Sequence, residues 1–523
     1  MVPFCDEEPR CSRITRSAHM AERFTRAVAP PPPPPLPPQA GEPAWSTPAC
    51  ASTLRAKTGR CAAIIGGGLS GLATAAAFAS RGFGVLIIDA SGEPGRAPAS
   101  SAAAGLLDPL TPKGKLMWQG LQAFDSARKL LDAAAAIEQQ HSTLPPLYRV
   151  AGTVHVPRGR KDAAALREAA MQHTASEECN RLGIAFVDSA APHGIASSAT
   201  AVPAEVASLA RSGACPDGAL YCGCGLLVDV PRYLCQLWKH VLVTAPAAMW
   251  SCQRSPDSLR LAAAFDCVVL AAGAGCLMID ETRHLPIDLC RGQVLEYRYA
   301  LGAMVGTDPA SAAACPLPPP PSETLASLLS LTVGLTGAVY LLPMASADNC
   351  ASSGTYGRRW LGGGTHEPCT DAEQRSPADL AHATEALHPG LVGLFPPLAA
   401  AGSPVCVRAG VRAMPPRSPE GSVPLAGRAH TNLPNVWFVS GMGARGLLYH
   451  ALIGEWVAEA AAMIDPSRLP AVLRRGEFAA VLAQRLVKLA ATRAAEDARP
   501  IQRSSESTRV ACPDFKLSVS STL

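Results

Sequence analysis

The chain has 523 residues, of which 48% are hydrophobic, so it can bury a sizeable core in two domains or one large composite domain. Its formal net charge of +4 is small for this length, so the bulk electrostatics require neither nucleic acid nor an anionic membrane as partner. The 18 cysteines follow no regular spacing, which predicts reduced intracellular thiols and makes a disulfide framework a poor alternative, and the pair Cys222 and Cys224 lacks the second ligand pair of a structural zinc site.

Residues 1–59 are predicted to be a disordered leader. They are rich in Arg, Ser, Ala and Pro, lack an apolar signal core, and contain the proline-rich run Pro30–Pro38, which favours extended polyproline. This composition resembles an organelle transit peptide, of a chloroplast rather than a mitochondrion, although Asp6, Glu7 and Glu8 are atypical of one. The alternative is a merely disordered tail on a cytoplasmic protein.

The longest uncharged stretch, Thr324–Ala347, does not predict a membrane helix. It contains repeated Ser, Thr and Gly residues and Pro343 near its end, which favour two short buried strands. No membrane partner is therefore expected.

A strand, a glycine turn, an Ala-rich helix and a second strand follow one another from Cys61 to Asp89. The turn fits G-x-G-x-x-G: Gly66 allows the tight turn, Gly68 lets a pyrophosphate approach the backbone, and Gly71 lets the helix pack closely on the strand. Asp89, at the end of the second strand, is placed to accept a ribose hydroxyl, which predicts FAD or NAD. The residues expected at this end of the cofactor are Gly66, Gly68, Leu69, Ser70, Gly71, Asp89 and Ala90.

The rest of the chain is predicted to be α/β, with a Rossmann-type domain interrupted in sequence by a second domain. Helical patterns at 121–139 and 231–243 alternate with strands, short β-like segments follow Gly292, and a strand and a final helix at 447–463 return to the first domain. The cofactor domain is expected at 60–145, 206–283 and 413–470. An antiparallel, sheet-rich substrate domain is expected at 146–205 and 284–412, and a peripheral helix and disordered tail at 471–523.

Five segments resemble, in order, the D-amino-acid-oxidase superfamily of FAD-dependent oxidoreductases, which includes glycine and sarcosine oxidases. They are ASSAAAGLLDPL (99–110), FDCVVLAAGAG (265–275), LCRGQVLEY (289–297), GVRAMPPRSPEGSVPLAG (410–427) and NVWFVSGMGARGLLYHALIGEWVAE (435–459). The GARGL turn is most similar to the FAD half of the bacterial enzyme that remodels the transfer-RNA wobble uridine. The resemblance covers roughly residues 61–470 and identifies the cofactor as FAD.

Further FAD contacts are implied by this resemblance. They are Ser100, Ser101, Ala104, Gly105, Leu106, Ala272, Gly273, Gly441, Gly443, Ala444, Arg445, Gly446 and Leu447. Two segments depart from the family pattern. Thr244–Leu261 is shorter and less strand-like than the segment that usually reaches the adenine, and the insert Pro316–Pro321 falls within the substrate sheet.

The resemblance also implies a substrate clamp. Arg412 matches the arginine that grips the substrate carboxylate through two charge-assisted hydrogen bonds, and a structural arginine is the alternative. Tyr340 matches a tyrosine that adds a third bond, and a core aromatic residue is equally consistent. Arg445 is expected to contact substrate or to stabilise the reduced flavin ring. His450 is expected to pack on the last helix rather than to act in catalysis.

The predicted function is oxidation of a carbon–nitrogen bond by hydride transfer to flavin, followed by hydrolysis of the imine, with molecular oxygen as the electron acceptor. The substrate is either free glycine or sarcosine, or the carboxymethylaminomethyl group of a transfer-RNA wobble uridine. For RNA, only the short basic clusters Arg158–Lys161 and Arg358–Arg359 are visible. A non-catalytic flavin-binding sensor or assembly factor in an organelle is the alternative class.

Overall fold

The computed structural model describes residues 47–139, 144–188, 202–211, 215–253, 257–300, 331–344, 357–369, 377–430 and 432–477. The leader up to residue 46, the prolines 316–321 and the tail after residue 477 lie outside the described residues. The described residues belong to one compact unit that begins at Thr47. Among them, no helix combines the length and the apolarity that a membrane crossing demands.

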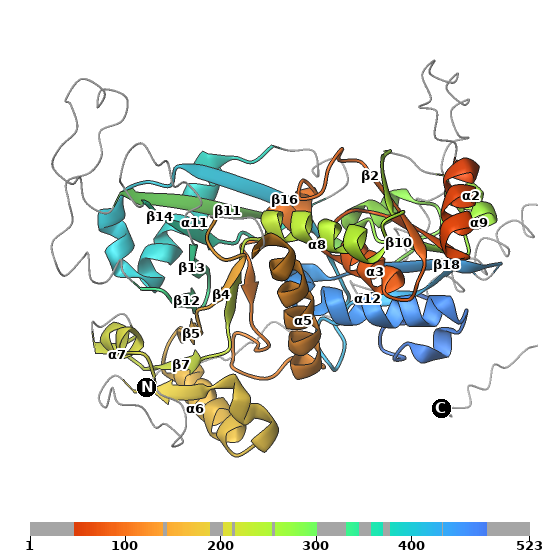
Figure 1. Cartoon of the computed structure of the whole chain (residues 1–523). Coiled ribbons are helices and arrows are strands. Elements are labelled where there is room, and N and C mark those ends of the chain that lie inside the picture. The colour runs from red at the N-terminus through yellow and green to blue at the C-terminus, as the bar shows by residue number, and fades with distance from the viewer. Residues whose placement is uncertain are drawn as a thin grey trace, which may run out of the picture. The chain divides into compact units, whose positions relative to one another are not determined.

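A six-stranded sheet forms the centre of the first domain (Figure 1). Its order is β17–β18–β10–β1–β2–β9, and every neighbouring pair is parallel except β17 with β18. β1, β2 and β10 bury nearly all their residues, as their continuous apolar sequences predict for strands covered on both faces. The strands are β1 (Cys61–Ile65), β2 (Gly84–Asp89), β9 (Met249–Cys252), β10 (Cys267–Leu270), β17 (Leu425–His430) and β18 (Leu433–Ser440).

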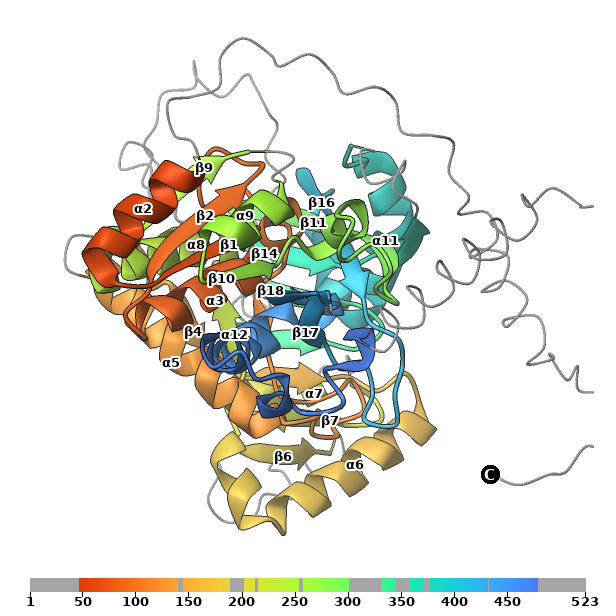
Figure 2. The same cartoon turned by 90° about the vertical axis from the view of Figure 1, so that its right-hand side faces the viewer.

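Different helices cover the two faces of this sheet (Figure 2). Ile64 and Ile87 pack toward α3, α5, α8 and α12, whereas Ile65 and Ile88 pack toward α2 and α9. Neighbouring isoleucines join different clusters because successive side chains of a strand point to opposite faces. The helices are α2 (Thr47–Thr58), α3 (Leu69–Ala79), α5 (Gly120–Gln139), α8 (Val230–Thr244), α9 (Ser258–Ala264) and α12 (Gly446–Ala462).

Helix α2 corrects the predicted leader, which extended to residue 59. Leu54 is fully buried against the sheet. Arg55 donates one hydrogen bond to the carbonyl of Ala264 at 2.9 Å and another to the carboxylate of Asp266 at 3.2 Å. The prediction of disorder is therefore wrong for residues 47–58. The helix has few large apolar residues, so its pattern is too weak to distinguish it from the leader.

A second sheet of nine strands follows the order β15–β11–β14–β13–β12–β5–β7–β6, with β16 also pairing with β11. It is antiparallel as predicted except between β12 and β5, which run parallel. The strands are β5 (Thr153–His155), β6 (Ile184–Val187), β7 (Ala219–Cys222), β11 (Asp288–Ala300), β12 (Gly334–Thr336), β13 (Tyr340–Met344), β14 (Gly357–Gly363), β15 (Glu367–Cys369) and β16 (Cys406–Met414).

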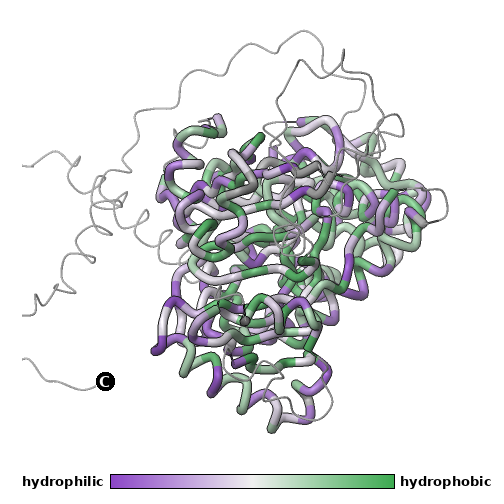
Figure 3. The backbone as a smooth tube through the Cα atoms, turned by 90° about the vertical axis from the view of Figure 1, so that its left-hand side faces the viewer, coloured by the Kyte–Doolittle hydropathy of each residue, from purple (hydrophilic) through white to green (hydrophobic). Residues whose placement is uncertain are grey.

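Smaller elements complete the described part. A three-stranded sheet orders β3 (Leu106–Leu107), β8 (Leu226–Val228) and β4 (Tyr148–Val150). The remaining helices are α4 (Pro98–Ser101), α6 (Arg160–Thr174), η1 (Glu177–Leu182), α7 (Ala204–Arg211), η2 (Gly273–Met278), α11 (Leu380–Leu394), η5 (Pro396–Ala401), η6 (Gly443–Arg445) and η7 (Pro466–Arg468). Figure 3 shows apolar stretches gathered in the interior and polar stretches toward the periphery. The predicted α/β class, with a Rossmann-type domain and a sheet-rich second domain, is confirmed.

Replacing Leu54 by Ala should destabilise the protein by about 2–5 kcal/mol, because the substitution leaves a cavity between α2 and the sheet. The exposed position Thr53 on the same helix supplies the control, and Thr53→Ala should change the free energy of unfolding by about 0.5 kcal/mol or less. Urea unfolding of both full-length variants measures the difference. Equal stability of the two would show that α2 does not support the sheet.

Candidate functional site

The turn after β1 has the backbone geometry of a dinucleotide-binding turn. Gly66 adopts a φ of +113°, which favours glycine. A Cβ on Gly71 would lie 1.8 Å from the carbonyl oxygen of Gly66, so α3 can approach β1 this closely only because residue 71 has no side chain. Gly68 is the N-cap of α3. The structure therefore forms the turn that the sequence predicts.

Asp89 lies beside this turn, at the end of β2. Its Oδ2 accepts a hydrogen bond from the N–H of Gly67 at 2.5 Å, and its Oδ1 accepts one from the N–H of Ser91 at 2.7 Å. Ala90, between Asp89 and Ser91 in the chain, is exposed. Trp250 of β9, which sequence reasoning missed, packs on the same turn: a Cβ on Gly67 would lie 2.3 Å from its Cη2 atom. The acid, the indole and the turn together form a corner that could receive an adenosine.

The N-terminus of α3 lies against the segment that resembles a flavin-contacting one. Ser100 Oγ accepts a hydrogen bond from the N–H of Leu69 at 3.1 Å. The first turn of α3 contains no acidic residue, so the positive end of the helix is available to an anion. Ser101 instead donates to the carbonyls of Gly95 and Ala97, at 2.6 and 2.8 Å, which indicates a structural role. This helix end fits a pyrophosphate.

Two further predicted segments also contain positions that require glycine or lie against the glycine turn. A Cβ on Gly105, whose φ is +91°, would lie 1.9 Å from the carbonyl oxygen of Val228, so this position of the β3–β8 pair requires glycine. A Cβ on Gly66 would lie 3.0 Å from the Cα of Ala272, so the end of β10 touches the glycine turn. Gly273, with a φ of +58°, follows at once.

The start of α12 lies beside the start of α3. Gly441 and Gly443 adopt positive φ angles of +68° and +53°, which turn the chain from β18 into the helix. A Cβ on Gly446 would lie 3.6 Å from Cδ1 of Leu69, the first residue of α3. Two helix N-termini, each with a partial positive charge, therefore lie side by side. This arrangement fits a cofactor with an anionic pyrophosphate and a ring that becomes anionic on reduction.

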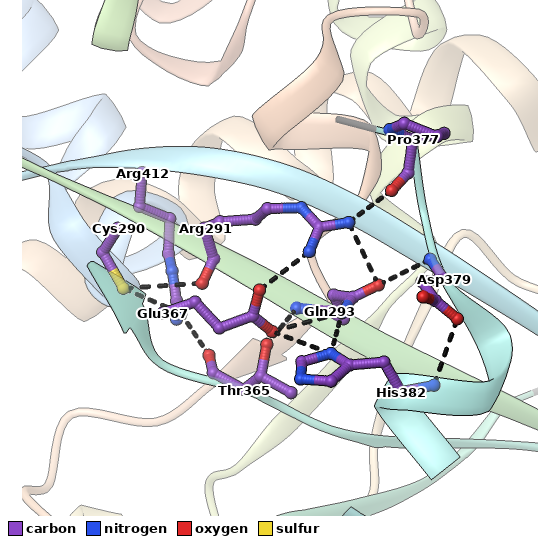
Figure 4. A network of polar contacts seen from close by, with 9 residues as sticks. All are labelled: Cys290, Arg291, Gln293, Thr365, Glu367, Pro377, Asp379, His382 and Arg412. Carbon is purple, nitrogen blue, oxygen red and sulfur yellow. Dashed lines mark hydrogen bonds and ion pairs between the residues drawn. The ribbon is translucent and has the colours of Figure 1, made fainter. Parts of the chain in front are cut away.

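Arg412 lies on β16 and reaches across β11 (Figure 4). β16 pairs with one edge of β11, with Arg412 opposite Cys290, whereas Thr365 lies on the other edge. The guanidinium passes over Gly292, where a Cβ would lie 2.5 Å from Nη2, and Nη2 donates to the carbonyl of Thr365 at 2.6 Å. Its Nε is buried and has no partner among the described residues, as is also the case for the Nε of the neighbouring Arg291. Arg412 is therefore held at one end and has a donor left for a ligand.

Tyr340 lies near this arginine. A Cβ on Gly363 or Gly364 would lie 2.8 or 3.1 Å from its Oη atom, so the hydroxyl rests on backbone that carries no side chains. Burial raises the pKa of Tyr340 to about 12, and the charge of Arg412 opposes this shift. The structure thus brings together the two residues that the sequence predicts for the clamp, with the phenol protonated and able to donate.

Arg445 precedes the first turn of α12 and is half-buried. Burial lowers the pKa of its guanidinium, while the nearby charge of Asp108 raises it. Within the part of the chain that the structure describes, no hydrogen bond or ion pair of this side chain is found. An arginine in this setting is free to bind an anionic group of a ligand.

Asp108 is a buried carboxylate that sequence reasoning missed. It accepts hydrogen bonds from Thr153 Oγ1 at 2.5 Å, from His155 Nε2 at 2.9 Å and from the N–H of Leu110 at 2.8 Å. Burial alone would raise the pKa of Asp108, but the charge and hydrogen bond of His155 and the bonds from Thr153 and Leu110 leave it below its usual value. A charged residue inside the apolar segment GLLDPL is the signal that could have found it.

His450 packs in the core, as the sequence predicts. The side chain is fully buried, its Nδ1 donates to the carbonyl of Leu447 at 3.0 Å, and its Nε2 accepts from the hydroxyl of Tyr233 at 2.7 Å. Burial lowers the pKa of His450 to about 4, so the ring is neutral at physiological pH.

The sequence matches a known family over most of its length. The model of the family described as FAD dependent oxidoreductase matches residues 62–460. A tRNA 5-methylaminomethyl-2-thiouridine biosynthesis bifunctional protein, MnmC of Polaromonas sp. strain JS666, is 27% identical over 434 residues, which are 77% of this chain and 57% of that protein. The chain therefore spans little more than half the length of this relative.

Solved structures share the fold. Iminodiacetate oxidase from Chelativorans sp. BNC1 superposes with a TM-score of 0.53 at 17% identity, covering 78% of this chain and 97% of that one. Glycine oxidase from Geobacillus kaustophilus gives a TM-score of 0.53 at 18% identity, covering 79% of this chain and 97% of that one. At these identities the likeness shows the fold alone.

Replacing Asp108 by Asn should cost about 3–5 kcal/mol of stability at neutral pH, because it removes the charged acceptor of a buried cluster. The folded-state pKa of Asp108 is lowered, so its contribution is present above the unfolded pKa of about 4 and is lost as the pH falls below it. The gap between wild type and variant should therefore narrow in acid. Asp125, in an exposed pair with Arg181, provides the control: Asp125→Asn should cost about 0–1 kcal/mol. Urea unfolding across pH measures both, and a gap that stays constant into acid would contradict the assignment.

Proposed function

Because the chain belongs to the family of FAD-dependent oxidoreductases, we propose that it oxidises the carbon–nitrogen bond of a small amine that carries a carboxylate. Bound FAD supplies the hydride acceptor for this reaction, which leaves an imine that water hydrolyses. The protein's main task is then to hold the substrate in one orientation, since positioning alone lowers the barrier of such a reaction.

The residues that would hold FAD are those around the two helix N-termini. The first turn of α3, with Gly68, Leu69, Ser70 and Ser100, would bind the pyrophosphate. Asp89 would approach the ribose, and Ala104–Leu106 and Gly441–Leu447 would contact the ring. The N–H groups at the start of α12 and the charge of Arg445 would stabilise negative charge on that ring.

The observation that carries the proposal is the setting of Arg412. Its guanidinium lies over Gly292 and beside Tyr340, and its buried Nε has no partner among the described residues. A buried donor without a partner is costly, and a substrate carboxylate would satisfy it. The hydroxyl of Tyr340 would donate a further hydrogen bond to the same carboxylate. Loss of this arginine would have favoured a flavin-binding sensor without turnover, but Arg412 is present.

Two substrate classes carry the required carboxymethylamino group. One is a free N-substituted or simple amino acid such as glycine or sarcosine, which agrees with the fold shared with amino-acid oxidases. The other is the carboxymethylaminomethyl group of a transfer-RNA wobble uridine, which the tRNA-modifying relative favours. Molecular oxygen is the proposed electron acceptor, and an organelle, with a chloroplast first, is the proposed location of the protein.

Anaerobic addition of substrate should bleach the absorbance of the bound flavin. Glycine, sarcosine and transfer RNA that carries the modified wobble uridine are the three compounds to compare. Bleaching by RNA alone would assign the RNA substrate, and bleaching by a free amino acid would assign that class. A flavoprotein that none of them bleaches would favour the sensor alternative over the enzyme.

Arg412→Met should lower the second-order rate constant of flavin reduction roughly 30- to 4,000-fold, because the loss of one partner of a buried charged contact costs about 2–5 kcal/mol. Flavin content should not change. Arg408→Met on the same strand is the matched control: its partner Glu296 keeps a second ion pair with Arg298, so reduction should stay near the wild-type rate. Stopped-flow reduction measures both. A normal rate in the Arg412→Met protein would place the clamp elsewhere.

A further inference from the structure

We infer that Gln293, with the ion pair Arg291–Glu367, is a positioning unit that fixes the orientation of Arg412 for a carboxylate ligand. It acts through the backbone carbonyl of Thr365, which holds one end of the guanidinium (Figure 4). The inference rests on the proposed function of Arg412 and adds the residues that orient its guanidinium.

The unit lies at a break in one edge of β11. On that edge β14 pairs with residues 294–300 and β15 pairs with residues 289–291, so the ladder is interrupted opposite Gly292 and Gln293. The chain between β14 and β15 passes this break through Gly364 and Thr365. Within this break the carbonyl of Thr365 accepts a hydrogen bond from the side chain of Arg412. The break thus supplies the acceptor that the arginine needs.

The backbone of Gln293 holds Thr365 in the break. Its N–H donates to Thr365 Oγ1 at 2.8 Å, and its carbonyl accepts from the N–H of Thr365 at 3.1 Å. Both contacts fix the peptide that presents its carbonyl to Arg412. The orientation of the guanidinium is therefore coupled to the position of residue 293.

The side chain of Gln293 is fully buried and bonded on both sides. Its Nε2 lies 3.1 Å from Oε1 of Glu367 and 3.2 Å from Nδ1 of His382, while its Oε1 accepts from the N–H of Asp379 at 2.9 Å and from Arg291 at 3.4 Å. An amide is required because one end must donate and the other accept. A carboxylate at this position would face Glu367 without a proton between them.

The ion pair of Arg291 with Glu367 fixes the other end of the break. Its atoms lie 2.7 Å apart, and the arginine also bonds the carbonyl of Pro377. Glu367 is the first residue of β15, so the pair ties the start of that strand to β11. Burial opposes ionisation of Glu367, but the bonds from Thr365, Gln293 and Arg291 keep its pKa below the usual value. The pair is therefore charged at neutral pH.

The test compares carboxylate affinity in the flavin-loaded, full-length protein, with acetate as the probe and the flavin spectrum as the readout. Gln293→Glu should weaken acetate binding roughly 5- to 150-fold, as expected for loss of one buried hydrogen bond. With an amine substrate, KM should rise by the same factor while kcat and flavin content stay nearly constant. The double variant Gln293→Glu with Glu367→Gln exchanges amide and carboxylate, restores the donor and acceptor pattern, and should recover most of the affinity.

Two further variants keep the result interpretable. Glu296→Gln weakens a different ion pair on β11, that with Arg408, and should leave acetate affinity unchanged. Thr365→Val removes the hydroxyl that accepts the N–H of Gln293 and that also bonds Glu367, and should weaken acetate binding even if Gln293→Glu does not fold. Unchanged affinity in a folded Gln293→Glu or Thr365→Val protein would overturn the inference, as would a folded double variant without recovery. If Arg412→Met also binds acetate normally, the proposed function of Arg412 fails as well; if only Arg412→Met loses affinity, the positioning unit alone is refuted.

Discussion

The close approach of α3 to β1 is the constraint on which the candidate site depends. Gly71 lies so near the carbonyl of Gly66 that any side chain would separate helix from strand. A second close contact, between Gly454 of α12 and the backbone of Ala73 in α3, brings these two helices together: a Cβ on Gly454 would lie only 3.0 Å from the carbonyl carbon of Ala73. Because both helices are held by glycine contacts, their N-termini lie side by side, and the two positive ends form one anion-binding region.

The charged side chains Asp108 and Arg412 of the candidate site are fixed by hydrogen bonds to neighbouring groups. The carboxylate oxygens of Asp108 accept hydrogen bonds from Thr153, His155 and a backbone N–H. Asp108 therefore interacts with Arg445 only through its charge, and the donors of the Arg445 guanidinium make no hydrogen bond to it. Arg412 is likewise held at one end, by the Thr365 carbonyl. Arg412 is thus oriented before a ligand arrives, which reduces the ordering cost of binding.

The parts that could be predicted from sequence are those specified by local chemistry. The glycine turn, Asp89 and the apolar strands follow from backbone geometry and from burial on both faces, and the order of the family segments led to Arg412 and Tyr340. Contacts between distant residues could not be predicted: Thr153 and His155 meet Asp108 only because β5 joins the second sheet, and Trp250 reaches the glycine turn only because β9 pairs with β2. Helix α2 was missed because it follows a low-complexity segment and has few large apolar residues.

The topology of the first sheet also dictates when the protein can fold during synthesis. β1 pairs with β10, and β10 pairs with β18, so the central strands come from three stretches of chain that leave the ribosome far apart in time. At about 5–20 residues per second, β1 and α2 wait tens of seconds for these partners. Arg55 can form its hydrogen bonds to Ala264 and Asp266 only after these residues have been synthesised. The edge of β1 that pairs with β10 therefore stays unpaired until that strand has been made, whereas β2 can pair with the other edge soon after β1 is made.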